Sequence, residues 1–88
     1  MSSTTWYRLL WKELRDRGET MEDIVSTTLT DAQMHAEFDC GYGGTEGVRF
    51  TAWTKNRVYF PACYDGAEWV ASVSRNPDGQ PTEHIGGG

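Results

Sequence analysis

VRFTAWTKNRVYFPACYDGAEWVASVS, residues 48–74, is the stretch that decides the fold, because it is typical of three β-strands joined by two tight turns. The stronger turn signal is Asp65-Gly66, since both residues tolerate the positive φ angles of a type I′ hairpin turn. A weaker turn is indicated at Lys55-Asn56, where Asn tolerates the left-handed region. This stretch therefore predicts a three-stranded antiparallel meander.

Side-chain alternation along the meander indicates how the sheet is covered. Successive residues of a strand point to opposite faces, which places Phe60, Ala62 and Tyr64 on one face and Tyr59 and Cys63 on the other. Such a pattern suits an antiparallel sheet with helix packed on one side.

A helix is predicted before the meander, with Thr4 or Thr5 as its N-cap and its end near Arg17. Its apolar residues fall on one face, so we expect the helix to cover the sheet. Gly18 follows as a terminator. The members of the apolar face are Trp6, Leu9, Leu10 and Leu14.

Between this helix and the meander we expect a short strand and a second short helix. Residues 24–29 are rich in β-branched side chains and favour a strand, with a continued helix as the alternative. Thr30 and Gln33 match a capping box that starts a helix at residues 31–38, with Met34 and Phe38 facing inward. Four glycines make residues 39–47 an irregular loop.

The whole chain is predicted to be one α+β domain, residues 1–88, with a small antiparallel sheet packed against two helices. The meander at 48–74 is joined by one or two short strands, of which residues 80–85 form an edge strand because of Pro81. Residues 1–4 and 86–88 are expected to be flexible ends.

Composition argues against direct binding of nucleic acid. The chain has 13 acidic and 8 basic residues and a formal net charge of -5, which favours a basic protein partner. It has no run of eighteen apolar residues, so we expect a cytoplasmic protein, a monomer, that does not bind membranes. Cys40 and Cys63 are expected to be reduced there, although a single bridge between them stays open.

The charge is unevenly distributed along the chain. Residues 19–47 hold seven acidic residues and no Lys or Arg. One interpretation is a solvated surface that keeps a small protein soluble. The other is an acidic face that docks on a basic groove and gives the association its specificity. For that face the predicted contact residues are Glu22, Asp23, Asp31, Glu37, Asp39 and Glu46, with Tyr42 as an aromatic anchor.

Other chemistry is less well supported by the sequence. His35, Cys40, Cys63 and His84 show no metal-ligand spacing, so neither a metal nor another cofactor is expected. A nucleophilic Cys40 with His35 as its base is an alternative, but Asp39 disfavours the thiolate by like charge. No catalytic residue is therefore predicted.

Two resemblances bear on function. Residues 86–88 resemble the diglycine tail of ubiquitin-like sulfur carriers, but those proteins begin with a β-hairpin, whereas this chain is predicted to begin with a helix. Residues 38–47, FTAWTKNRVYFP (50–61) and YDGAEWVASVSRNP (64–77) resemble small phage and mobile-element proteins among which anti-CRISPR inhibitors are found. This resemblance covers roughly residues 22–88.

The second resemblance implies a non-enzymatic, stoichiometric inhibitor. Such a protein binds a CRISPR effector in the host cytoplasm and stops it recognising or cutting DNA. Effectors hold nucleic acid in positively charged channels, which an acidic surface can enter as a DNA mimic. The first alternative is another protein-interaction module with a basic partner. A diglycine-tailed carrier protein and a Cys-dependent enzyme are the further alternatives.

Overall fold

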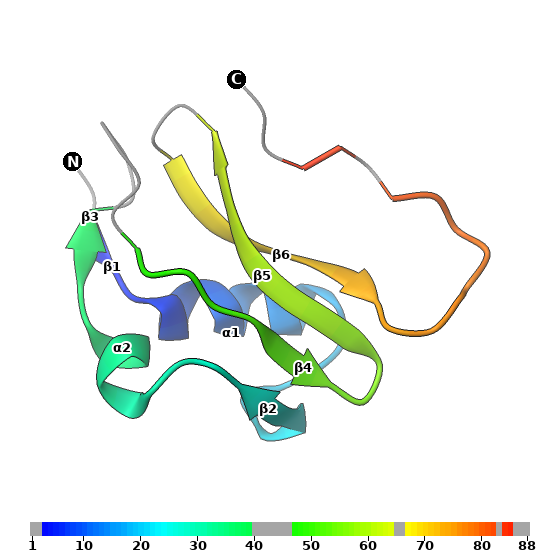
Figure 1. Cartoon of the computed structure of the whole chain (residues 1–88), viewed down its shortest axis with the longest axis horizontal. Coiled ribbons are helices and arrows are strands. Elements are labelled where there is room, and N and C mark those ends of the chain that lie inside the picture. The colour runs from blue at the N-terminus through cyan, green and yellow to red at the C-terminus, as the bar shows by residue number, and fades with distance from the viewer. Residues whose placement is uncertain (1–2, 40–46, 65–66, 83, 86–88) are drawn as a thin grey trace.

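The computed structural model describes residues 3–39, 47–64, 67–82 and 84–85. These residues form two α-helices, one 3-10 helix and six β-strands, which confirms the predicted α+β class (Figure 1). In chain order the elements are β1 (Ser3–Thr4), α1 (Trp6–Asp16), η1 (Met21–Asp23), β2 (Ile24–Thr27), α2 (Asp31–His35), β3 (Phe38–Asp39), β4 (Ala52–Thr54), β5 (Arg57–Tyr64) and β6 (Ala67–Ser74).

The main sheet has the strand order β2-β4-β5-β6, and every neighbouring pair is antiparallel. The predicted meander is confirmed, although its first strand begins at Ala52. Tyr59 pairs with Ala52 on one side and with Ser72 on the other. The Asp65-Gly66 turn lies outside the described residues, but Tyr64 and Ala67 on either side of it are paired.

Helix α1 forms as predicted. The Thr5 Oγ1 accepts a hydrogen bond from the Arg8 backbone N–H at 3.2 Å, which caps the helix. Trp6, Leu10 and Leu14 are buried. The helix ends before Gly18, whose φ of 79° is a conformation that favours glycine.

The second helix is shorter than predicted. The capping box of Thr30 and Gln33 is present, but Ala36 has an extended backbone and α2 ends at His35. Phe38 instead lies in β3, where it pairs with Thr4 of β1. Its ring centroid is 4.8 Å from that of Trp6, so it faces inward from a strand, not from the helix. The contact with Trp6 and the strand pairing replace the last helical turn.

The predicted strand at residues 24–29 ends at Thr27, and the alternative of a continued helix is wrong. An irregularity in the pairing with β4 falls between Ile24 and Ser26. Leu29 is buried although it lies outside the strand. The strand prediction was therefore correct in type and too long by two residues.

One prediction about the chain ends and one about the glycine loop need correction. Ser3 and Thr4 form β1 and Thr4 is buried, so they are not a flexible start. Asp39 belongs to β3 and not to the loop. Residues 40–46, 1–2 and 86–88 lie outside the described part.

The predicted edge strand at residues 80–85 is absent from the described residues of that segment, which are 80–82 and 84–85. Pro77 and Pro81 have no N–H to donate to a strand ladder. The Gln80 N–H donates to Asp78 Oδ1 at 3.0 Å, which uses this donor locally. In Figure 1 the segment leaves the end of β6 and turns back.

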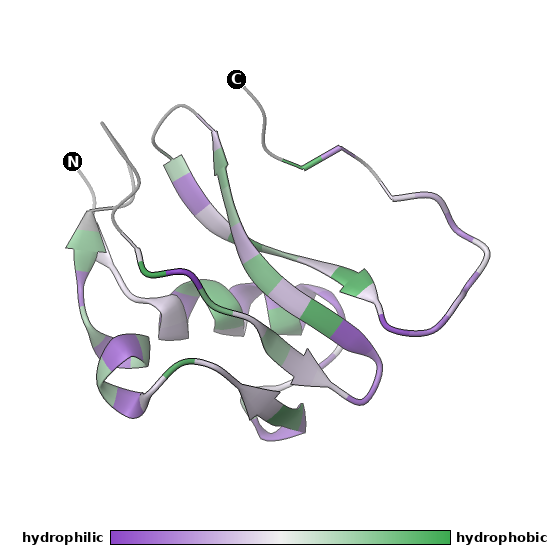
Figure 2. Ribbon diagram, viewed as in Figure 1, coloured by the Kyte–Doolittle hydropathy of each residue, from purple (hydrophilic) through white to green (hydrophobic). Residues whose placement is uncertain are grey.

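The two faces of the sheet differ as the alternation predicted. Helix α1 covers the face that carries Tyr59 and Ser72, because Ser72 Oγ donates to Glu13 Oε2 of α1 at 2.9 Å. The opposite face carries the half-buried side chains of Phe60 and Trp69. Apolar residues are therefore present on both faces of β5 and β6. Figure 2 shows that hydrophobic and hydrophilic residues are interspersed along these two strands.

A polar cluster around Glu19 joins the end of α1 to the sheet. Its carboxylate accepts hydrogen bonds from Thr54 Oγ1 at 2.9 Å, from Tyr59 Oη at 2.5 Å and from Asn56 Nδ2 at 3.4 Å. Thr54 and Tyr59 are fully buried. The pKa of Tyr59 is raised well above its ordinary value. Burial of the hydroxyl is the main cause, and the hydrogen bond to Glu19 is the second.

Tyr59→Phe tests this cluster through the dependence of stability on pH. Because the folded state raises the pKa of Tyr59, the stabilisation from its protonated hydroxyl is complete below about pH 10 and is lost as the pH rises further. We expect Tyr59→Phe to cost about 1 kcal/mol at neutral pH. The difference between the wild type and the variant should shrink above about pH 10 in urea denaturation curves. A difference that stays constant there would contradict this account.

Gly47→Ala tests the close approach of the backbone to Trp6. A Cβ at Gly47 would overlap Trp6 Cζ2 and would lie 3.0 Å from Glu68 Oε1. We expect a loss of about 1–3 kcal/mol in the free energy of unfolding, because the buried indole must shift. In a double-mutant cycle, Trp6→Phe should reduce the cost of Gly47→Ala. Strict additivity would mean that the ring is not the obstacle.

Candidate functional site

Three exposed carboxylates form the surface that we call the acidic edge: Glu22 of η1, Asp31 at the start of α2, and Glu37 just before β3. In Figure 1, β2 with the short turn that precedes it lies along the lower side of the molecule, and α2 lies to its left. The capping box that starts α2 sets the position of Asp31. The contact of Phe38 with Trp6 sets the position of Glu37 beside it.

None of the three carboxylates of the acidic edge forms an ion pair with a described residue. The ion pairs among the described residues all lie on α1 or at its end. They are Lys12–Asp16, Arg15–Asp16 and Arg17–Glu13. The Glu37 carboxylate accepts a hydrogen bond from Ser3 Oγ at 3.0 Å and stays exposed. Its negative charge is thus available to a partner.

The other predicted contact residues have different positions. Asp23 closes a capping box, because its carboxylate accepts from the Thr20 N–H at 2.8 Å. Asp39 pairs with Ser3 through β3, which places its backbone next to the acidic edge. Tyr42 and Glu46 lie outside the described residues. The structure therefore brings Asp31, Glu37 and the backbone of Asp39 to one end of the molecule, with Glu22 further along the same edge.

Glu19 belongs to the same charge-rich segment, but it is half-buried and hydrogen-bonds to the sheet. Its carboxylate accepts three hydrogen bonds, from Thr54, Asn56 and Tyr59, which gives it a structural role. The acidic segment thus contains residues that hold the fold together and residues that are exposed on the surface. The sequence alone does not distinguish the two groups.

A shallow hollow of about 130 Å³ lies beside Glu37, and the sequence did not predict it. Its wall is mostly apolar and includes Phe38, Val48 and the edge of Trp6. Val48 is 44% exposed. The hollow is large enough for part of one side chain, so a partner that contacts Glu37 also meets an apolar surface there.

The exposed side of α1 lies next to the acidic edge, because α1 contacts α2 there. The Tyr7 ring stacks on His35 at 4.9 Å between centroids, and Arg15 lies 4.9 Å above the Trp11 ring. Arg8 and Lys12 are exposed on the same helix. Helix α1 therefore carries both basic and acidic side chains, and its acidic residues Glu13 and Asp16 form ion pairs.

The residues considered for other chemistry are not brought together in the described part of the chain. The exposed His35 has its Nδ1 3.1 Å from the carbonyl oxygen of Asp31, and Cys40 lies outside the described residues. No group of three His, Cys, Asp or Glu side chains within the described ranges is arranged to hold a metal ion. None of the helices described is long and apolar enough to cross a membrane.

Comparison with known proteins gives no relative. No family model matches the chain, and neither a curated protein nor a solved structure is significantly similar to it.

Paired substitutions test the division of the acidic residues into structural and surface groups. Glu19→Gln should lower the free energy of unfolding by about 1–3 kcal/mol, because an amide does not accept all the hydrogen bonds of the carboxylate. Glu22→Gln removes the same charge from an exposed site and should change it by no more than about 0.5 kcal/mol. Thermal and urea denaturation measure both. Equal effects would contradict the distinction.

Proposed function

We propose that this protein is a non-enzymatic binding protein whose acidic edge occupies a basic, nucleic-acid-binding groove on a larger protein partner. The observation that carries the proposal is the exposure of Glu22, Asp31 and Glu37 without an ion-pair partner among the described residues. Carboxylates held on a folded scaffold accept hydrogen bonds from the same Arg and Lys side chains that bind phosphate groups.

The positions of the carboxylates support specific binding. Asp31 follows a capped helix start, and Glu37 is hydrogen-bonded to Ser3 and adjoins the buried contact between Phe38 and Trp6. Side chains on ordered elements lose less conformational freedom on binding than side chains on a disordered tail. The hollow beside Glu37 adds apolar contact, which is the kind of surface that a partner side chain fills at the centre of an interface.

In its specific form, the proposal is that the partner is a CRISPR effector and that binding prevents the effector from recognising or binding DNA. The resemblance of residues 22–88 to small phage and mobile-element proteins supports this form. The acidic edge supports it independently, because effectors hold DNA in positively charged channels. A protein module with another basic partner is the second candidate, favoured by the same exposed carboxylates.

A charge-reversal experiment tests the acidic edge. Asp31→Lys combined with Glu37→Lys should weaken binding by at least about tenfold, because two attractive contacts become repulsive in a basic groove. The assay measures binding of labelled target DNA by a panel of purified CRISPR effectors while the protein is added. The wild type should displace the DNA stoichiometrically from at least one effector.

The matched control is Asp16→Lys combined with Asp78→Lys, which changes the net charge equally but away from the acidic edge. We expect this control to inhibit like the wild type. If both double variants lose inhibition alike, only the net charge matters, and the proposal that the acidic edge is the binding surface is wrong. If the wild type displaces DNA from no effector in the panel, the CRISPR form of the proposal is wrong.

A further inference from the structure

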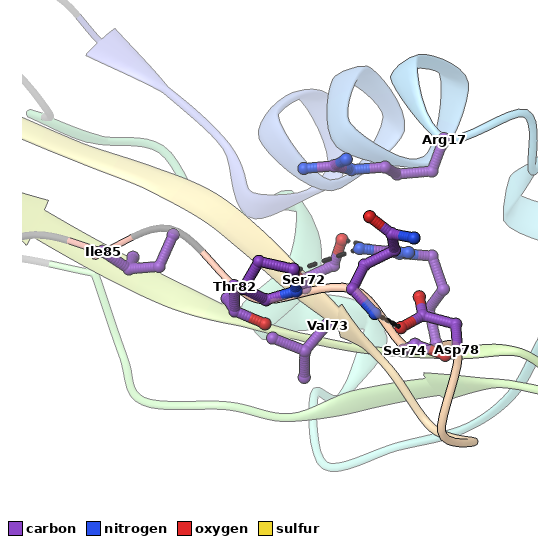
Figure 3. Close-up of a pocket in the computed structure, with 10 residues that line it drawn as sticks. Arg17, Ser72, Val73, Ser74, Asp78, Thr82 and Ile85 are labelled. Atoms are coloured by element: carbon purple, nitrogen blue, oxygen red, sulfur yellow. Dashed lines mark hydrogen bonds between the residues drawn. The ribbon is translucent and has the colours of Figure 1, made fainter.

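A cavity of about 320 Å³ lies on the other side of the molecule from α2, between the end of α1, strand β6 and the segment after it (Figure 3). Arg17 enters from the end of α1, and Ser72 and Val73 come from β6. Thr82 and Ile85 close it from the C-terminal segment. The acidic edge contributes no residue to its wall.

Arg57 of β5 also lines this cavity, and its guanidinium is held in a fixed orientation. Its Nε donates to Ser72 Oγ at 2.9 Å, and one terminal nitrogen donates to the Ser72 carbonyl oxygen at 3.1 Å. Ser72 is buried, and its hydroxyl in turn donates to Glu13 Oε2 at 2.9 Å. A chain of hydrogen bonds from α1 to β5 therefore positions the positive charge.

The charge of Arg57 has no carboxylate partner among the described residues. Glu13, which lies behind Ser72, forms its ion pair with Arg17 at 2.9 Å. A guanidinium carries more N–H donors than the two that Ser72 engages, and an anion is their best partner. The half-buried Arg57 thus presents, beside a cavity, N–H donors that no described residue engages.

The rest of the wall indicates the size and polarity of a ligand. Val73, Pro81 and Ile85 supply apolar surface. Asp78 also lines the cavity, and its carboxylate accepts a hydrogen bond from the Gln80 N–H. The part of the wall formed by Asp78 therefore disfavours an anion. The volume falls at the lower end of the range of about 300–1,000 Å³ that is typical of small-molecule sites.

We propose that this cavity binds a small organic molecule through a carboxylate or phosphate group. The anionic group lies on Arg57, with Arg17 at the entrance, and the apolar body lies against Val73, Pro81 and Ile85. This site is separate from the acidic edge, and the proposal does not depend on the function proposed for that edge.

Titration with two probes tests the site and identifies the anionic group. Inorganic phosphate and butyrate are added separately to the ¹⁵N-labelled protein, with sodium chloride at equal ionic strength as the reference. We expect saturable shifts in the NMR signals of the Arg57 side-chain Nε–H and the Val73 amide for at least one probe. Saturation by phosphate alone indicates a phosphate ligand, and saturation by butyrate alone indicates a carboxylate with an apolar body. Saturation by neither probe would overturn the proposal.

Two substitutions separate the cavity from general charge. Arg57→Gln should weaken binding of the effective probe by about tenfold or more, since the main charged donor is lost. Arg15→Gln removes the same charge from an exposed position on α1 and should leave the affinity unchanged. Equal losses in the two variants would overturn the proposal. If Arg57→Gln does not fold, Arg17→Gln at the entrance replaces it and must weaken binding more than Arg15→Gln does.

Discussion

The burial of the Trp6 side chain is the interaction on which the rest of the structure depends. The indole is 1% exposed, and its Nε1 donates to the Val48 carbonyl oxygen at 3.1 Å. Its ring packs on Phe38 at 4.8 Å and on Phe50 at 4.9 Å between centroids. One side chain at the start of α1 therefore joins the small β1–β3 sheet to the segment that leads into the main sheet. Glu37 of the acidic edge directly precedes Phe38, the residue that packs on Trp6.

Elements with a local signal could be predicted from the sequence. The apolar stripe of α1 and the alternation around Asp65-Gly66 repeat over several residues, so one misleading residue does not change the result. The β1–β3 pairing has no such signal, because each strand has only two residues and its partner is far along the chain. The same lack of a local signal explains why Phe38 was assigned to the wrong element. Its apolar character predicted burial, but the element that buries it depends on the distant Trp6.

The candidate sites show the same division between local and long-range information. The number of carboxylates in residues 19–47 was evident, but the role of Glu19 depends on hydrogen bonds to Thr54 and Tyr59, which are far along the chain. The cavity at Arg57 was not predicted at all, because its wall combines residues from α1, β5, β6 and the C-terminal segment. No spacing along the chain brings Arg17 and Arg57 to one place. Only the packing of α1 on β6 does so.

Strand β6 has a consequence for how copies of this protein behave at high concentration. It is the eight-residue edge of the main sheet, and within the described residues no strand covers its outer side. Long edge strands are templates for pairing with another chain. Glu68 places a charged side chain inside the fold near the end of this edge, where it accepts from the Gly47 N–H at 3.1 Å. Inward-pointing charge is one means by which natural sheets resist edge-to-edge aggregation. The buried carboxylate is thus a feature of the kind that disfavours edge-to-edge pairing, besides being a local hydrogen-bond acceptor.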